Sequence, residues 1–289
     1  MAVVFYGVRA AAVIGLAAVT AMLTDLICLY LRGRPYQLVN FSNIGHAVVL
    51  ALLFPATVPY SIVILSTVFA VAVGTHVFGY RKDLLFPPAA VGYLFALTCW
   101  KDEVLQFPEV TGGLRLFHND VPLGASLTSL FNEKGSFQTL HTETLDLLIG
   151  AVPGAMGTGC ILLLALGLVI LLLRRQLDLY AALGFIYCGV LPMIAGNATI
   201  GIYATNMLLF SLMFFVADPA VMPCRGLGAF LAGLLTAFVT GVLIVLYHIE
   251  YAPVIAVILC CPAWRWLSTL RRRGSTASAK TQEEEASHE

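Results

Sequence analysis

Two uninterrupted apolar stretches decide the fold: Cys160–Leu173 (CILLLALGLVILLL) and Leu227–Leu246 (LGAFLAGLLTAFVTGVLIVL). Neither stretch alternates apolar with polar residues, as the strands of a transmembrane barrel do. Each is instead typical of a transmembrane helix, which needs about 20 mainly apolar residues to cross a bilayer.

The composition of the whole chain agrees with these two stretches. Of 289 residues, 60% are hydrophobic and 11% are charged, and the mean hydropathy is +0.90. Soluble domains carry about 25% charged residues, so a soluble globular enzyme is excluded. Sixteen basic residues balance sixteen acidic ones, which argues against a nucleic-acid-binding protein because such proteins need a basic face.

The sequence therefore predicts an all-α polytopic membrane protein with about nine transmembrane helices, four before a long polar loop and five after it. We expect an N-terminal helical bundle (1–100), an external loop (101–145), a C-terminal helical bundle (146–268) and a disordered cytoplasmic tail (269–289). The predicted spans are 8–31, 43–57, 59–79, 84–100, 146–173, 178–195, 199–217, 226–247 and 250–267.

The scarce basic residues predict the orientation, because cytoplasmic loops are enriched in Lys and Arg. Twelve of the sixteen fall on one side of the nine-helix arrangement, and the other side holds only Arg9, Lys101, Arg115 and Lys134. We therefore expect the C-terminus in the cytoplasm, and the N-terminus and the loop 101–145 outside.

The external loop is acidic and also partly apolar. From Lys101 to Asp146 it holds seven acids and three bases, together with several Phe and Leu residues. A loop of this length is usually functional or disordered, and its apolar residues predict packing against the external face of the bundle.

The seven cysteines include no C-x-x-C pair, and most lie in apolar spans. No metal site is predicted within this chain, although a cluster completed by a partner subunit stays an alternative. His46, His76 and His248 lie in or at the ends of spans, where a satisfied interhelical histidine is the more common role.

Pro and Gly interrupt three spans, at Phe86–Ala89 (FPPA), Gly150–Gly159 (GAVPGAMGTG) and Ala217–Pro223 (ADPAVMP). Such breaks line ligand sites in transport proteins, or else mark tight helix crossings. Asp218 and Pro219 are candidate site residues, with a plain helix cap as the alternative. Asp25 is either part of an ion path or an interfacial acid.

A candidate cofactor site lies in the loop, at Asp120-Val-Pro-Leu-Gly-Ala-Ser126. This segment resembles the D-x-x-[ST]-G-A-[ST] sequence at which a flavin transferase attaches flavin mononucleotide (FMN). The resemblance implies that Ser126 forms a phosphoester with FMN, and that Asp120, Gly124 and Ala125 are further residues of the cofactor site. Thr128 is a second possible acceptor.

The order of segments resembles RnfD, the large membrane subunit of Rnf-type electron transport complexes. It is similar, more distantly, to the NqrB subunit of the sodium-translocating NADH:quinone reductase. The resemblance rests on five segments in the family's order: Tyr6–Arg9, Asn40–Pro55, Gly79–Gly92, Gly150–Gly159 and Phe214–Gly226. Family members have ten helices in two five-helix repeats, so we expect the first helix here to be absent or cut short. Two residues depart from the family pattern: Leu123 stands where the family has Ser or Thr, and Thr158 stands where the family has Glu.

The resemblance implies a flavin-carrying subunit in the bacterial inner membrane. The complex would couple ferredoxin or NAD(H) redox chemistry to the translocation of sodium ions or protons. Covalent FMN on Ser126, a second noncovalent riboflavin, a flavin transferase and further subunits are the implied cofactors and partners. The alternatives are a small-solute channel or secondary transporter of related fold, and a structural subunit that has lost its cofactor.

Overall fold

The computed structural model describes residues 2–33, 42–79, 84–109, 114, 116, 122–124, 126, 149–150, 153–196, 207–247 and 249–286. The chain is mainly helical (73%), as the apolar runs predict. The residues that the structure describes also include one small two-stranded sheet. Four of the described helices are long and apolar enough to cross a membrane: Ala2–Leu31, Tyr60–Val77, Leu227–Ile244 and Ala252–Thr269. Their exposed sides carry many large apolar residues, which suit contact with lipid.

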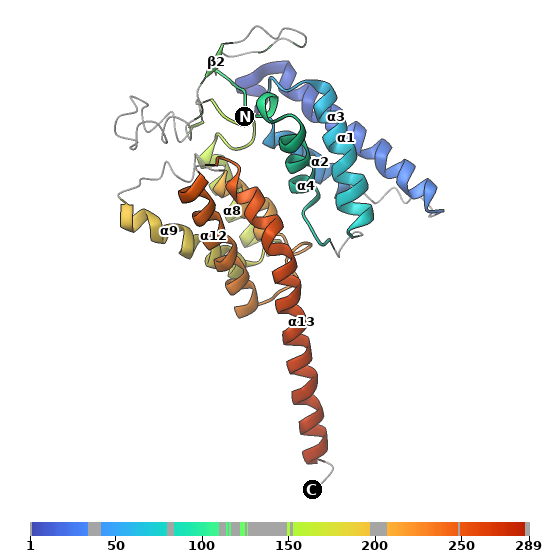
Figure 1. The fold of residues 1–289 in the computed structure, drawn as a ribbon, viewed down its shortest axis with the longest axis vertical. Coiled ribbons are helices and arrows are strands. Elements are labelled where there is room, and N and C mark those ends of the chain that lie inside the picture. Colours follow the sequence, from blue (N-terminus) through green and yellow to red (C-terminus); the bar gives the residue numbers. More distant parts are fainter. Residues whose placement is uncertain are drawn as a thin grey trace.

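In the N-terminal half, α1 packs against α2, α3 and η1, and α4 packs against η1 and α3 (Figure 1). The bounds of these elements are α1 Ala2–Leu31, α2 Ser42–Leu53, α3 Tyr60–Phe69, η1 Ala70–Val77 and α4 Pro88–Cys99. The π-helix η1 continues α3 directly, so the two cover the predicted span 59–79 together. Gly7 has a φ of 68° and divides α1 close to the predicted start of the first span at residue 8.

Three short elements belong to the loop region: α5 (Lys101–Val104), β1 (Phe107–Pro108) and β2 (Leu123–Gly124). The two strands pair antiparallel, with Phe107 opposite Gly124 and Pro108 opposite Leu123. This pairing fixes the end of the flavin-type motif beside the segment that leaves α4 and α5.

In the C-terminal half, α9 and α12 make the most extensive contact of the described elements, and α13 packs along α12 (Figure 1). The bounds are α8 Ile161–Leu173, α9 Leu179–Gly196, α11 Leu208–Ser211, η3 Leu212–Val216, α12 Leu227–Tyr247 and α13 Ala252–Ala286. A Cβ atom on Gly184 would lie 2.2 Å from the Phe230 carbonyl oxygen, and one on Gly233 would lie 2.2 Å from that of Ala181. The α9–α12 crossing therefore depends on glycine in both helices.

Several predicted spans are only partly helical. Helix α2 ends at Leu53, because Pro55 and Pro59 cannot continue it. Helix α4 begins at Pro88, within the Phe86–Ala89 break, and α8 begins at Ile161, just after the Gly150–Gly159 break. Helix α13 continues to Ala286, into the tail expected to be disordered, where Ala, Lys, Gln and Glu favour a helix.

Candidate functional site

Ser126, the predicted FMN acceptor, lies two residues after β2 and is buried, with 6% of its surface exposed. Its hydroxyl donates a hydrogen bond of 3.1 Å to Oε2 of Glu250. Glu250 lies in the connection between α12 and α13 and is half-buried. The motif is thus fastened to the C-terminal bundle through its hydroxyl residue.

Gly124 is packed too closely for any other residue. A Cβ atom there would lie 2.5 Å from Cγ of Pro153 and 3.1 Å from Cγ of Glu109. Pro153 belongs to the glycine-rich break before α8, so two of the predicted features lie in contact. Leu123, which stands where the flavin motif has Ser or Thr, is exposed. Asp120 and Ala125 lie outside the described residues.

The break before α8 satisfies its own backbone by pairing with the end of α2. The Met156 N–H donates to the Phe54 carbonyl (3.1 Å), and the Gly157 N–H donates to the Leu52 carbonyl (2.7 Å). These carbonyls lie at the end of α2, where a helix leaves its last carbonyls without a partner of its own. Non-helical backbone at membrane depth requires partners of this kind, so the two broken segments support each other.

The segment Tyr6–Arg9 holds two of the broken segments in place. The Tyr6 hydroxyl donates to the Gly154 carbonyl (3.3 Å). Arg9 is 3% exposed and donates to the Thr57 carbonyl (2.9 Å), and its guanidinium lies over the Tyr60 ring. Arg9 therefore lies inside the bundle and holds these segments together. From the sequence alone, Arg9 is predicted only to be one of the few basic residues on the external side.

Asp218 and Pro219 form a turn directly after η3. The Asp218 carboxylate accepts from the Ala220 N–H (2.9 Å), and its main-chain carbonyl accepts from Val221 and Met222. Pro219 is exposed. Asp218 also interacts electrostatically with His46 of α2, so the turn closes η3 and faces the N-terminal half as well. The contacts leave both the ligand role and the capping role open.

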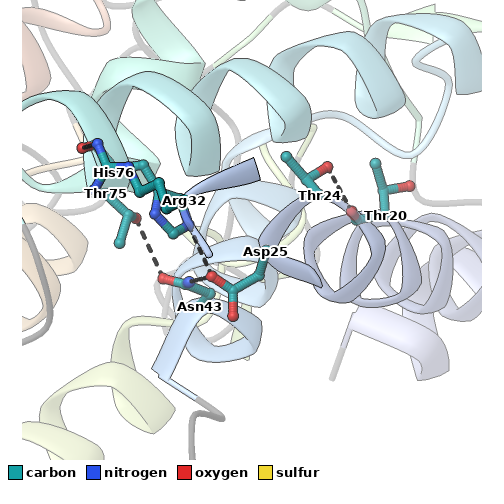
Figure 2. A network of polar contacts seen from close by, with 7 residues as sticks. All are labelled: Thr20, Thr24, Asp25, Arg32, Asn43, Thr75 and His76. Atoms are coloured by element: carbon teal, nitrogen blue, oxygen red, sulfur yellow. Dashed lines mark hydrogen bonds and ion pairs between the residues drawn. The ribbon is translucent and has the colours of Figure 1, made fainter. Parts of the chain in front are cut away.

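Asp25 is buried in α1 and lies at the centre of a polar cluster (Figure 2). Its Oδ1 accepts from Nδ2 of Asn43 (2.8 Å) and lies 2.8 Å from Nε2 of His76. An interfacial acid in contact with water would not be enclosed in this way, so Asp25 lies inside the bundle, and its part in an ion path stays a prediction.

Among the residues that the structure describes, no three His, Cys, Asp or Glu side chains gather as metal ligands. Three partners of candidate residues were not predicted from the sequence: Glu250, Asn43 and His76 in its contact with Asp25. A charged or polar residue in or beside an apolar span is the one available signal for each of them.

The fold and the site together define a multi-pass membrane protein whose helices are broken and braced at membrane depth, with a loop hydroxyl held against the bundle. A sequence model of the NQR2, RnfD, RnfE family matches residues 1–266. The chain belongs to this family.

Proteins named as the RnfD subunit of an ion-translocating oxidoreductase complex are similar to the chain over most of its length. The protein from Actinobacillus succinogenes is 25% identical over 280 residues, covering 81% of this chain and 77% of its own. The protein from Halorhodospira halophila is 27% identical over 259 residues, covering 77% and 72%. That from Methanosarcina acetivorans is 22% identical over 240 residues, covering 83% and 73%. The chain is accordingly a membrane subunit of the kind found in ion-translocating oxidoreductase complexes.

Proposed function

We propose that this protein is the flavin-carrying membrane subunit of an Rnf-type electron transport complex in a bacterial inner membrane, with FMN joined to Ser126 as a phosphoester. The proposal rests on the position of Ser126 in a chain whose residues 1–266 match the family model. Ser126 ends a flavin-type motif, and its hydroxyl lies beside a carboxylate.

The residues around Ser126 fit a phosphoester site. Ser126 supplies the hydroxyl oxygen that must attack a phosphorus atom, and in the packed loop that hydroxyl donates to Glu250. In the transfer the Ser126 Oγ–phosphorus bond forms, the phosphate leaving group departs from an activated flavin nucleotide, and the hydroxyl proton passes to a base. Gly124 allows the strand to lie directly on Pro153.

The modified and unmodified chains must differ at this site. Once Oγ carries a phosphorus atom it has no hydrogen to donate, and a phosphate next to Glu250 places two negative groups together. Attachment therefore breaks the Ser126–Glu250 hydrogen bond and moves Ser126 out of its buried position. We infer that the transferase acts on the loop before it packs, or in an opened state.

A bound flavin supplies one- and two-electron redox chemistry, and the protein supplies position and surroundings. The loop would lie on the outer side of the membrane with the N-terminus, as the distribution of Lys and Arg predicts, and the C-terminus would lie in the cytoplasm. Ferredoxin or NAD(H) would react on partner subunits, and a noncovalent riboflavin would continue the electron path towards the cytoplasm. Asp218 and Pro219 are candidate contacts for that second cofactor or for the translocated sodium ion or proton.

The proposal is tested by in-gel flavin fluorescence of the protein produced with and without a flavin transferase. Wild-type chain should fluoresce only with the transferase, and Ser126→Ala should remain dark. A dark wild-type chain that takes up a small solute in liposomes would instead favour the channel or transporter. A dark chain whose complex still transfers electrons would favour a structural subunit.

A further inference from the structure

The cluster around Asp25 joins three helical elements through side chains that are almost completely buried. Asp25 comes from α1, Asn43 from α2, and Thr75 and His76 from η1 (Figure 2). The exposed fractions of these four residues lie between 4% and 6%. A carboxylate at such a position costs several kcal/mol unless it is paired, so its presence calls for a function or a strong partner.

The partners of the carboxylate are nitrogen donors. Asn43 Nδ2 and His76 Nε2 both lie 2.8 Å from Oδ1 of Asp25. The side-chain oxygen of Asn43 accepts from the Thr75 hydroxyl (3.2 Å). A sodium ion needs several free oxygen ligands, whereas Oδ1 of Asp25 and the amide oxygen of Asn43 already accept hydrogen bonds. The donor set fits a proton shared between carboxylate and imidazole rather than an alkali cation.

The charges close to the pair balance it. Arg32, directly after α1, donates to the main-chain carbonyl of His76. With Asp25 negative and Arg32 positive, the cluster is neutral when His76 is neutral and carries one positive charge when His76 is protonated. A proton on His76 would give the buried Asp25 carboxylate an imidazolium partner at 2.8 Å, and without that proton Arg32 supplies the balancing positive charge.

The other described groups near the pair do not change this balance. Cys28 of α1 is within electrostatic range of both Asp25 and Arg32. His46 of α2 interacts with Asp218. The charged residues Arg34, Arg81, Lys82 and Asp83 follow α1 and η1 in segments outside the described residues.

The cluster lies at the end of α1 opposite the flavin-type loop. Tyr6, near the start of α1, contacts the loop residue Leu114 and the break before α8. From Val8 to Asp25 the helix rises about 26 Å at 1.5 Å per residue. The pair is therefore close to the side of the membrane on which Arg32 lies, from which a proton can reach it over a short distance.

We propose that Asp25 and His76 form a proton-binding site on the ion path of the complex, loaded from the Arg32 side of the membrane. In the empty state the neutral His76 ring donates Nε2–H to the Asp25 carboxylate. Loading adds one proton to the imidazole and leaves an imidazolium–carboxylate pair, with no other bond made or broken. The role in transport rests on the proposed function, whereas the binding of the proton does not.

The test is pH-difference infrared spectroscopy of the purified complex, without turnover. In a scan from about pH 5 to pH 8, wild type should show a histidine protonation signal that is absent from His76→Gln. Asp25→Asn should weaken this signal, because the carboxylate that would pair with the protonated ring is gone. Thr24→Val is the matched control: its hydroxyl donates to the Thr20 carbonyl of the same helix (Figure 2), and the change should leave the signal unaltered.

Two outcomes would overturn the inference. One is a spectrum with no signal that depends on His76 over this pH range in a complex whose Thr24→Val form behaves as wild type. The other is a carboxylate signal that responds to sodium at fixed pH, which would make the cluster an alkali-cation site. Repeating the titration with Ser126→Ala separates the proposals, because the proton signal should persist when the covalent flavin is lost.

Discussion

The Ser126 hydroxyl and the Glu250 carboxylate lie 3.1 Å apart although 124 residues separate them in the sequence. This contact joins the loop to the connection between α12 and α13, at the residue proposed to accept FMN. It is available only to the unmodified serine, because an esterified oxygen has no proton to donate.

The coupling between Ser126 and Glu250 is the first prediction. In protein produced without a flavin transferase, Ser126→Ala and Glu250→Ala should show a coupling free energy of about 1 kcal/mol in a double-mutant cycle. The value is small for a hydrogen bond to a charged group because Glu250 is partly exposed to solvent. Unfolding midpoints in detergent measure it. Glu103→Ala, an exposed acid on α5, is the control and should show no coupling to Ser126→Ala.

In the flavinylated protein the same substitution should behave differently. Glu250→Ala should cost less stability there than in the unmodified chain, because the hydrogen bond has already been broken and a repulsive charge is removed. An equal loss in the two forms would mean that the contact survives attachment.

The contact between the two broken segments is the second prediction. In Gly157→Ala the new methyl would lie 2.6 Å from Cβ of Leu52 and 3.0 Å from the Phe210 ring. Overpacking of this kind costs about 1–3 kcal/mol, so the melting temperature in detergent should fall by several degrees. Gly45→Ala on α2 has nothing within 4 Å and should not lower it. A neutral Gly157→Ala would show that α2 and the break before α8 are not in contact.

The glycine crossing of α9 and α12 is the third prediction. In Gly233→Ala the methyl would meet the main chain at Ala181. Main-chain atoms cannot relieve the clash by a rotamer change, as a side chain could. We expect a loss of about 2 kcal/mol or more, measured by thermal unfolding. Gly241→Ala on the same helix has open space and serves as control. Equal melting temperatures for the two variants would contradict the crossing.

Much of the fold could be predicted from the sequence where apolar residues run without interruption. The predicted spans 226–247 and 178–195 agree closely with α12 and α9, because nothing in them competes with the helix. The span 43–57 was too long, since Pro55 ends α2 early. The predicted break at Gly150–Gly159 was recognisable by composition, but its pairing with Leu52 and Phe54 was not.

The site was predictable only in its local parts. Ser126 and Gly124 stand in a short motif, and Asp25 is conspicuous as an acid in an apolar span. Their partners Glu250, Asn43 and His76 come from other elements, and one sequence carries no signal of long-range pairing. Contacts of this kind are set by how the helices pack, which the periodicity of each helix leaves undetermined.

The most direct test of the central claim is the mass of the intact protein, purified from cells that contain a flavin transferase. The wild-type chain should be heavier than its sequence by one FMN less one water. Ser126→Thr should carry the same addition, because it keeps a hydroxyl, and Ser126→Ala should have the bare mass. A wild-type chain without the addition, or a Ser126→Ala chain that still carries it, for example on Thr128, would contradict the assignment of the flavin to Ser126.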